Sequence, residues 1–153
     1  MKLATAIAYV AAQNAPTQKS VTHSGMSIAI EHPKGSMREI KNDDGQTVWK
    51  KQMQYDYGYI RNTQGRDGDE IDVMMGPLQQ CSDAYVIHMV DMGPDVSERQ
   101  DEDKVMLGFP SAGAARQAFH SHYPPDFYGG MTVVPVSEFK QRAMGKQVAN
   151  FAV

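Results

Sequence analysis

Short apolar runs, several of them alternating with polar residues, recur along the middle of the chain. Ile28 and Ile30 alternate with smaller or polar neighbours, and residues 84–90 form the clearest run of this kind. A period of two residues is typical of a half-buried β-strand. The sequence therefore predicts strands in six segments, which are MSIAIEH, TVWKKQM, YDYGYI, EIDVMM, AYVIHMV and KVMLGF.

Turn residues separate these runs. Asp44 and Gly45, within NDDGQ, favour a hairpin whose return strand is TVWKKQM. Gly76 and Pro77 end the EIDVMM run, and the polar segment MGPDVSERQDED is predicted as a loop. Many short strands separated by turns indicate an antiparallel architecture.

A helical period appears only towards the two ends of the chain. Ser111 is an N-cap candidate, and after it Ala115, Ala118, Phe119 and His122 recur at helical spacing. A last helix is predicted from Ser137 to near Gly145. Between these helices MTVVPV is predicted as an edge strand, because proline cannot donate to a sheet ladder.

The first residues form a short alanine-rich apolar run after a lysine. This run loosely resembles a secretory signal, but it is short, and a helix that ends near residues 14–16 is the preferred interpretation. We therefore expect an N-terminal helix or extension at residues 1–18 and a single domain at residues 19–153. The fold class expected is α+β, mainly β, as a small OB-like antiparallel β-barrel or strongly curved sheet with peripheral helices.

Composition narrows the function classes. The chain has 153 residues, 41% apolar and 22% charged, with a net charge of −3. That balance gives no reason to expect a nucleic-acid partner or an anionic membrane surface, and no stretch approaches the length of a membrane span. The single cysteine, Cys81, excludes an internal disulfide framework and a cysteine-rich zinc site, and it fits a cytoplasmic location.

The histidines do not suggest zinc either. They are scattered, and the closest two are separated by two positions, which is the wrong spacing for one helix face. We expect that last pair to be exposed or capping residues. The five are His23, His32, His88, His120 and His122.

The segment DGDEID carries four acidic side chains in six residues. Asp67 and Asp69 flank Gly68, which permits a sharp turn, and Asp72 follows on a strand. Oxygen ligands in this number suit Mg2+, which prefers carboxylates and keeps several waters. A solvated acidic turn explains the same residues, and Ca2+ remains open, although the EF-hand pattern is absent.

A second acidic group, DEDK, begins at Asp101 and ends at Lys104. If the strands on either side of the preceding loop form a hairpin, Asp91 lies near this group. A lysine beside carboxylates suits phosphate binding around a metal, and a solvated charge run is the competing interpretation. Tyr57 shares one strand face with two other tyrosines, either in the core or as a hydrogen-bond donor to phosphate.

These segments together resemble soluble family I inorganic pyrophosphatases. The family carries a Y-G-[FY]-I element followed by D-G-D-P-x-D-V, and here Tyr57 begins YGYI ten residues before Asp67. HPKGS, YDYGYI and KVMLGF further resemble a short, phage-associated branch. The resemblance covers roughly residues 26 to 140, and it implies a pyrophosphatase-type barrel.

The resemblance implies roles for individual residues. Asp69 corresponds to the carboxylate that deprotonates a metal-bound water, with Tyr57 beside it at the catalytic centre. The implied metal ligands are Asp67, Asp69, Asp72, Asp91, and Asp101 or Glu102. The implied substrate-binding residues are Glu31, Arg38, Lys51, Tyr57, Lys104 and Tyr123.

The activity implied is Mg2+-dependent hydrolysis of pyrophosphate, with Mn2+ as an alternative metal. The expected setting is the cytoplasm, that of the host if a phage encodes the chain, with no nucleic-acid or membrane partner and with a homo-oligomer left open. One departure is Pro124, which stands where the family has a phosphate-contacting lysine. Lys50, Arg61 or Arg66 are candidates to compensate. The alternative function is a non-catalytic or altered-specificity phosphate- or nucleotide-binding protein of a phage or mobile-element complex on the same fold.

Overall fold

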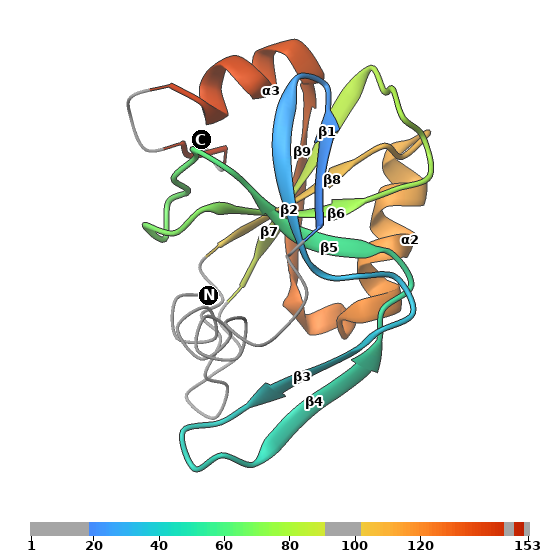
Figure 1. The fold of residues 1–153 in the computed structure, drawn as a ribbon, viewed down its shortest axis with the longest axis vertical. Coiled ribbons are helices and arrows are strands. Elements are labelled where there is room, and N and C mark those ends of the chain that lie inside the picture. Colours follow the sequence, from blue (N-terminus) through green and yellow to red (C-terminus); the bar gives the residue numbers. More distant parts are fainter. Residues whose placement is uncertain (1–18, 91–101, 146–148, 152–153) are drawn as a thin grey trace.

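A seven-stranded sheet forms the centre of the protein, with two α-helices packed on it and a separate two-stranded hairpin (Figure 1). The computed structural model describes residues 19–90, 102–145 and 149–151. The strands of the sheet, in spatial order, are β1 (Lys19–His23), β2 (Met26–His32), β5 (Asp56–Ile60), β6 (Ile71–Met75), β8 (Asp103–Leu107), β7 (Asp83–Met89) and β9 (Tyr128–Pro135).

The sheet is open, so the predicted closed barrel is wrong. β1 and β9 are its two edges, and no pairing joins them among the described residues. The sheet is also not wholly antiparallel, because β6 pairs with β8 in parallel while the other neighbours are antiparallel. The coarser prediction of a mainly β, α+β fold is confirmed.

The two faces of the sheet bury two different cores. Val73 and Val105 belong to the first core, which includes Phe139 from helix α3 (Val136–Ala143). Their strand neighbours point to the opposite face, because side chains alternate along a strand. Met74 and Met106 accordingly belong to the second core, which helix α2 covers.

Helix α2 (Ala112–His122) begins as its sequence predicts. The Ser111 side chain accepts a hydrogen bond from the backbone N–H of Ala114, which confirms Ser111 as the N-cap. A short 3-10 turn, η1 (Pro125–Phe127), then leads into β9. The predicted edge position of the proline-containing strand is confirmed, with Pro135 as the last residue of β9.

The hairpin of β3 (Met37–Lys41) and β4 (Thr47–Gln52) extends away from the body of the protein (Figure 1). We call it the β3–β4 arm. Two backbone hydrogen bonds of 2.8 Å close its base, from Gly35 N to Met53 O and from Met53 N to Ser36 O. The predicted turn at residues 42–46 is at its tip, where the Asn42 side chain accepts from the N–H groups of Asp44 and Gln46.

Strands β1 and β3 were not predicted. The helix predicted at the N-terminus lies outside the described residues. In the part of the chain that is described, no helix combines the length and the apolar character needed to cross a membrane.

Gly58 permits the close packing of β5 on β2. A Cβ atom added at Gly58 would lie 1.8 Å from the backbone oxygen of Ala29, so backbone would have to move. We expect Gly58→Ala to lower the free energy of unfolding by about 3 kcal/mol or more, the upper range for overpacking. Gly113→Ala in α2 is the control, because its Cβ meets nothing closer than 3.9 Å. Urea unfolding measures both, and a small loss at Gly58 would contradict the packing.

Candidate active site

A buried ammonium group lies at the centre of the candidate site. The side chain of Lys104 is 1% exposed, and its Nζ is 2.8 Å from Asp72 Oδ2 and 2.8 Å from Glu102 Oε1. The same nitrogen donates a hydrogen bond to the hydroxyl of Tyr57, which in turn donates to Asp72 Oδ2 at 2.9 Å. One cation therefore neutralises two buried carboxylates, and the Tyr57 phenol is hydrogen-bonded to both the ammonium group and Asp72.

Strand register brings these groups together. Asp72 of β6 and Lys104 of β8 are partners in the parallel pair, so their side chains lie next to each other on the same face. Tyr57 of β5 pairs with Met74, two residues beyond Asp72 on that face. The cluster therefore lies at one end of the second core.

The charged groups in this cluster shift one another's pKa values. Burial, the largest single influence, would lower the pKa of Lys104, but Asp72 and Glu102 outweigh it and hold that pKa well above its usual value. Burial would raise the pKa of Asp72, and the ion pair with Lys104 lowers it instead. Burial and the charge of Asp72 raise the pKa of Tyr57, which keeps its phenol protonated.

The carboxyl group of Glu31, near the end of β2, is also coupled electrostatically to this cluster. It is half-buried, and burial followed by the negative charge of Asp72 raises the pKa of its carboxyl group. The predicted location of Glu31 beside the site is consistent with this coupling.

The β3–β4 arm supplies a cationic and aromatic wall. Arg38 is 3% exposed, and its Nη1 donates to the hydroxyl of Tyr123 at 2.8 Å. Its guanidinium lies 4.4 Å from the ring centroid of Tyr57 and 5.8 Å from that of Trp49. Trp49 stacks on Tyr123 at 5.7 Å. Lys51, the strand partner of Arg38, is exposed on the arm.

The acidic turn, defined here as residues 63–70, lies just before β6. The Asp67 side chain accepts from the backbone N–H of Asp69 at 3.0 Å, and Gly68 has a φ of +88°. That left-handed conformation favours glycine, as the sequence suggested. Asp67 is exposed, and Asp69 and Glu70 are partly exposed.

The structure gathers most of the predicted site residues that it describes. The residues connected by contacts or charge coupling around Lys104 are Glu31, Arg38, Tyr57, Asp72, Glu102 and Tyr123. Lys51 lies on the arm, and Asp67 and Asp69 lie on the acidic turn. The predicted ligands Asp91 and Asp101 are outside the described residues.

The donor chemistry fits a hard divalent cation. Asp72 is held ionised, and further carboxylates lie on the adjoining acidic turn. Within residues 19–90, 102–145 and 149–151, no three His, Cys, Asp or Glu side chains are grouped closely enough to hold a metal by themselves. Mg2+ usually keeps several waters and takes one or two carboxylates together with substrate phosphates, so it needs no closed protein cage.

The protein therefore has a polar site at one end of an open sheet, and the site is made of buried cations, phenols and carboxylates. The family model for Inorganic Pyrophosphatase matches residues 9–144. The chain belongs to the inorganic pyrophosphatase family, which confirms the resemblance at the level of the family. No curated protein matches the chain.

Sequence reasoning missed two residues at the site. Trp49 was placed on a strand without a role, although its two-residue spacing from Lys51 puts both on one face of the arm. His122 was expected to be exposed or capping, but it is 2% exposed, and its Nε2 accepts the backbone N–H of Gln54 at 2.7 Å. No local pattern could reveal a partner 68 residues away.

The ion pairs of Lys104 generate a stability prediction. Lys104→Met leaves two buried carboxylates without their cation, and we expect a loss of about 3–5 kcal/mol in the free energy of unfolding. Adding Asp72→Asn and Glu102→Gln to that variant should recover most of the loss. Lys50→Met is the matched control, because Lys50 is exposed and 3.5 Å from Glu39, and we expect at most about 1 kcal/mol. Equal losses at both lysines in urea unfolding would contradict this account.

His122 generates a pH prediction. Burial, and then the charges of Arg38 and Lys51, lower its pKa from 6.5 to about 4. The unfolded chain therefore gains a proton near pH 6.5 that the folded protein takes up only near pH 4. The stability due to neutral His122 is complete above about pH 6.5 and is lost as the pH falls towards 4.

His122→Gln tests this prediction, because glutamine keeps an acceptor for Gln54 N–H but does not titrate. We expect the stability advantage of the wild type over this variant to shrink from pH 7 to pH 4.5 in urea unfolding. An advantage that is constant across that range would overturn the prediction.

Proposed function

We propose that the protein hydrolyses inorganic pyrophosphate to two phosphates with Mg2+, or with Mn2+ in its place. The family supports a pyrophosphatase-like function and a divalent metal in general. The observation that carries the proposal is the Lys104 cluster, in which an ammonium group, a phenol and two carboxylates meet beneath the arginine of the arm. Pyrophosphate and a metal need this combination of positive and negative groups.

The acidic groups take the metal and the attacking water in this proposal. Within the part of the chain that the structure describes, the proposed metal ligands are Asp67, Asp69, Asp72 and Glu102, and Asp91 and Asp101 are further candidates. When bound, the metal lowers the pKa of its water and screens the phosphoryl oxygens. Asp69, on the acidic turn, is the base that accepts the proton of the attacking water.

The cationic and phenolic groups hold the phosphates. Arg38 presents a planar guanidinium that suits phosphate oxygens, and Lys51 adds a charge from the same face of the arm. Because the Tyr123 hydroxyl accepts from Arg38, its own hydrogen can be donated to a phosphate oxygen. Lys104 and Tyr57 act from beneath, and Glu31 completes the set at the end of β2.

The missing lysine at Pro124 is not replaced by the three residues that the sequence suggested. Lys50 is 3.5 Å from Glu39, Arg61 donates to Ser20 at 2.9 Å, and Arg66 donates to Asp103 at 3.1 Å. The arm, with Arg38 and Lys51, therefore carries the positive charge opposite Lys104.

A second function rests on Trp49 and Pro124. An aromatic ring beside Arg38 could stack on a base, so binding of a nucleotide or another phosphoanhydride is the competing proposal on the same fold. The phage or mobile-element association belongs to this proposal and rests only on the segments that resemble the phage-associated branch.

Phosphate release from pyrophosphate, ATP and dNTPs, with Mg2+, Mn2+ or a chelator, separates the two functions. We expect pyrophosphate turnover that requires metal. Asp69→Asn should lower kcat by about 10²–10⁴-fold, as loss of a general base does, with an unchanged circular dichroism spectrum. Glu70→Gln, the adjacent carboxylate with no assigned role, should retain activity.

Two outcomes would count against the first function. Folded wild-type protein that releases no phosphate from pyrophosphate would exclude it and leave nucleotide binding. Full activity in Asp69→Asn would leave the reaction in place but remove Asp69 as the base.

A further inference from the structure

Residues 149–151 lie beyond the part of the chain that the family model matches, and they contact the acidic turn. Ala149 N donates to Gln64 O at 3.0 Å, and Ala149 forms a parallel bridge with Gly65. Asn150 O accepts from Arg142 at 3.1 Å. The two contacts of Ala149 connect the turn to a segment 85 residues after Gln64 in the sequence.

Phe151 anchors this segment in the first core. It is 1% exposed and stacks on Phe139 of α3, with ring centroids 5.0 Å apart. The guanidinium of Arg142 lies 4.5 Å from its ring centroid. The backbone oxygen of Phe151 accepts from the hydroxyl of Thr132 on β9 at 3.0 Å.

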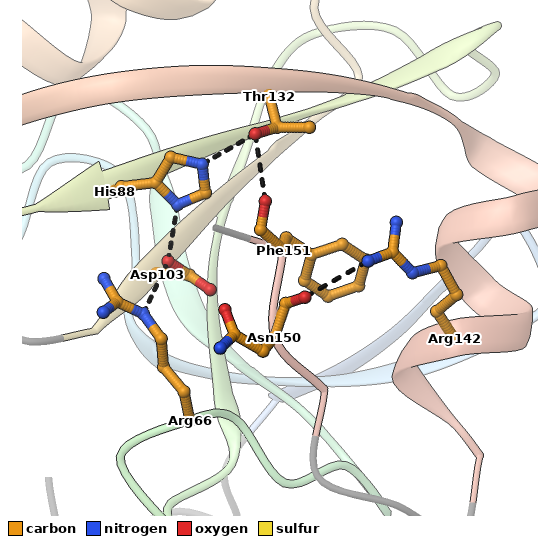
Figure 2. A network of polar contacts seen from close by, with 7 residues as sticks. All are labelled: Arg66, His88, Asp103, Thr132, Arg142, Asn150 and Phe151. Carbon is orange, nitrogen blue, oxygen red and sulfur yellow. Dashed lines mark hydrogen bonds and ion pairs between the residues drawn. The ribbon is translucent and has the colours of Figure 1, made fainter. Parts of the chain in front are cut away.

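From Thr132 a chain of hydrogen bonds returns to the acidic turn (Figure 2). His88 Nε2 is 2.7 Å from Thr132 Oγ1, and His88 Nδ1 is 2.8 Å from Asp103 Oδ1. The same carboxylate oxygen accepts from Arg66 Nε at 3.1 Å. Arg66 immediately precedes Asp67, so the turn is held at Gln64 and again at Arg66.

The directions of these hydrogen bonds make Thr132 the central link. Its one hydroxyl hydrogen is donated to the Phe151 carbonyl, which can only accept. His88 Nδ1 donates to the Asp103 carboxylate, which can only accept, and its Nε2 is joined to the Thr132 hydroxyl by the 2.7 Å hydrogen bond. Removing the hydroxyl would leave His88 Nε2 and the Phe151 carbonyl without the group that they share.

We infer that residues 149–151, Thr132, His88, Asp103 and Arg66 form a clamp that positions the acidic turn for divalent cation binding. None of these residues is a proposed metal ligand or touches the substrate, so each is a positioning residue. Asp103 lies between Glu102 and Lys104 in sequence, so the clamp also fixes the start of β8, where the second acidic group meets Lys104. The effect on cation affinity rests on the proposed function, whereas the effect on the turn does not.

The test compares Thr132→Val, which removes the hydroxyl at nearly constant shape, with Thr132→Ser, which restores it. We expect the Mg2+ dissociation constant, measured by calorimetry without substrate, to rise on the order of 10-fold in Thr132→Val, as for loss of a supporting hydrogen bond. Thr132→Ser should stay within about 2-fold of the wild type. Gln117→Gly, at an exposed position of α2, destabilises that helix by up to about 1 kcal/mol, so it controls for general loss of stability and should leave Mg2+ affinity unchanged.

Hydrogen exchange of peptides from residues 63–71 supplies a readout that needs no metal. The amides of Gly65, Gly68 and Asp69 should exchange faster in Thr132→Val only. Unchanged exchange in that variant would overturn the clamp even in an active enzyme. If exchange is faster in Thr132→Val but the wild-type protein neither binds Mg2+ nor cleaves pyrophosphate, the clamp is retained and the proposed function is rejected. An equal loss of Mg2+ affinity in Gln117→Gly would show that the effect comes from general loss of stability, and it would also overturn the clamp.

Discussion

The site depends on one buried ammonium group, that of Lys104. Burying the lysine side chain has a large desolvation cost. The two carboxylates in contact with it offset that cost only because the geometry is close and a phenol completes the hydrogen bonds. The alternating pattern of β8 puts Val105 and Leu107 into one core and Lys104 and Met106 towards the other. The charge is therefore placed by the same strand that builds the hydrophobic layers.

The two faces of the sheet carry different sets of polar contacts. On the face covered by α2, Lys104 and the arm bring cations, phenols and acids together. On the face covered by α3, Asp103 and His88 connect the acidic turn to β9 and Phe151. Adjacent residues of one strand, Asp103 and Lys104, thus serve opposite faces, and a change at either one can reach both.

Much of the fold was predictable because its signals are local. Most strands in the middle of the chain, though not β3, follow from neighbouring residues, and so do the N-cap at Ser111 and the edge position of the strand with Pro135. Closure of the sheet does not, because it depends on whether two edges far apart in sequence meet. Strand β1 was missed because KSVTH is largely polar and has only one fully buried side chain, that of His23.

The site was predictable for a different reason. Motif order located Tyr57, Asp72, Arg38 and Lys104, and strand register then brought them into contact. Trp49 and His122 were not located, because their roles arise from the arm and α2 meeting across the molecule. The catalytic, metal-binding and substrate-binding roles remain predictions for all of these residues, and for Asp67 and Asp69 as well.

The parallel pairing of β6 and β8 also orders events during synthesis. Asp72 leaves the ribosome 32 residues ahead of its counter-ion, and Tyr57 precedes that lysine by 47 residues. Parallel strands cannot be joined by a tight turn, so this contact closes a long loop, whose entropy must be lost before the ion pair forms. The nascent chain therefore carries the acid before its counter-ion, and the charged centre of the site can form only after Lys104 has been synthesised.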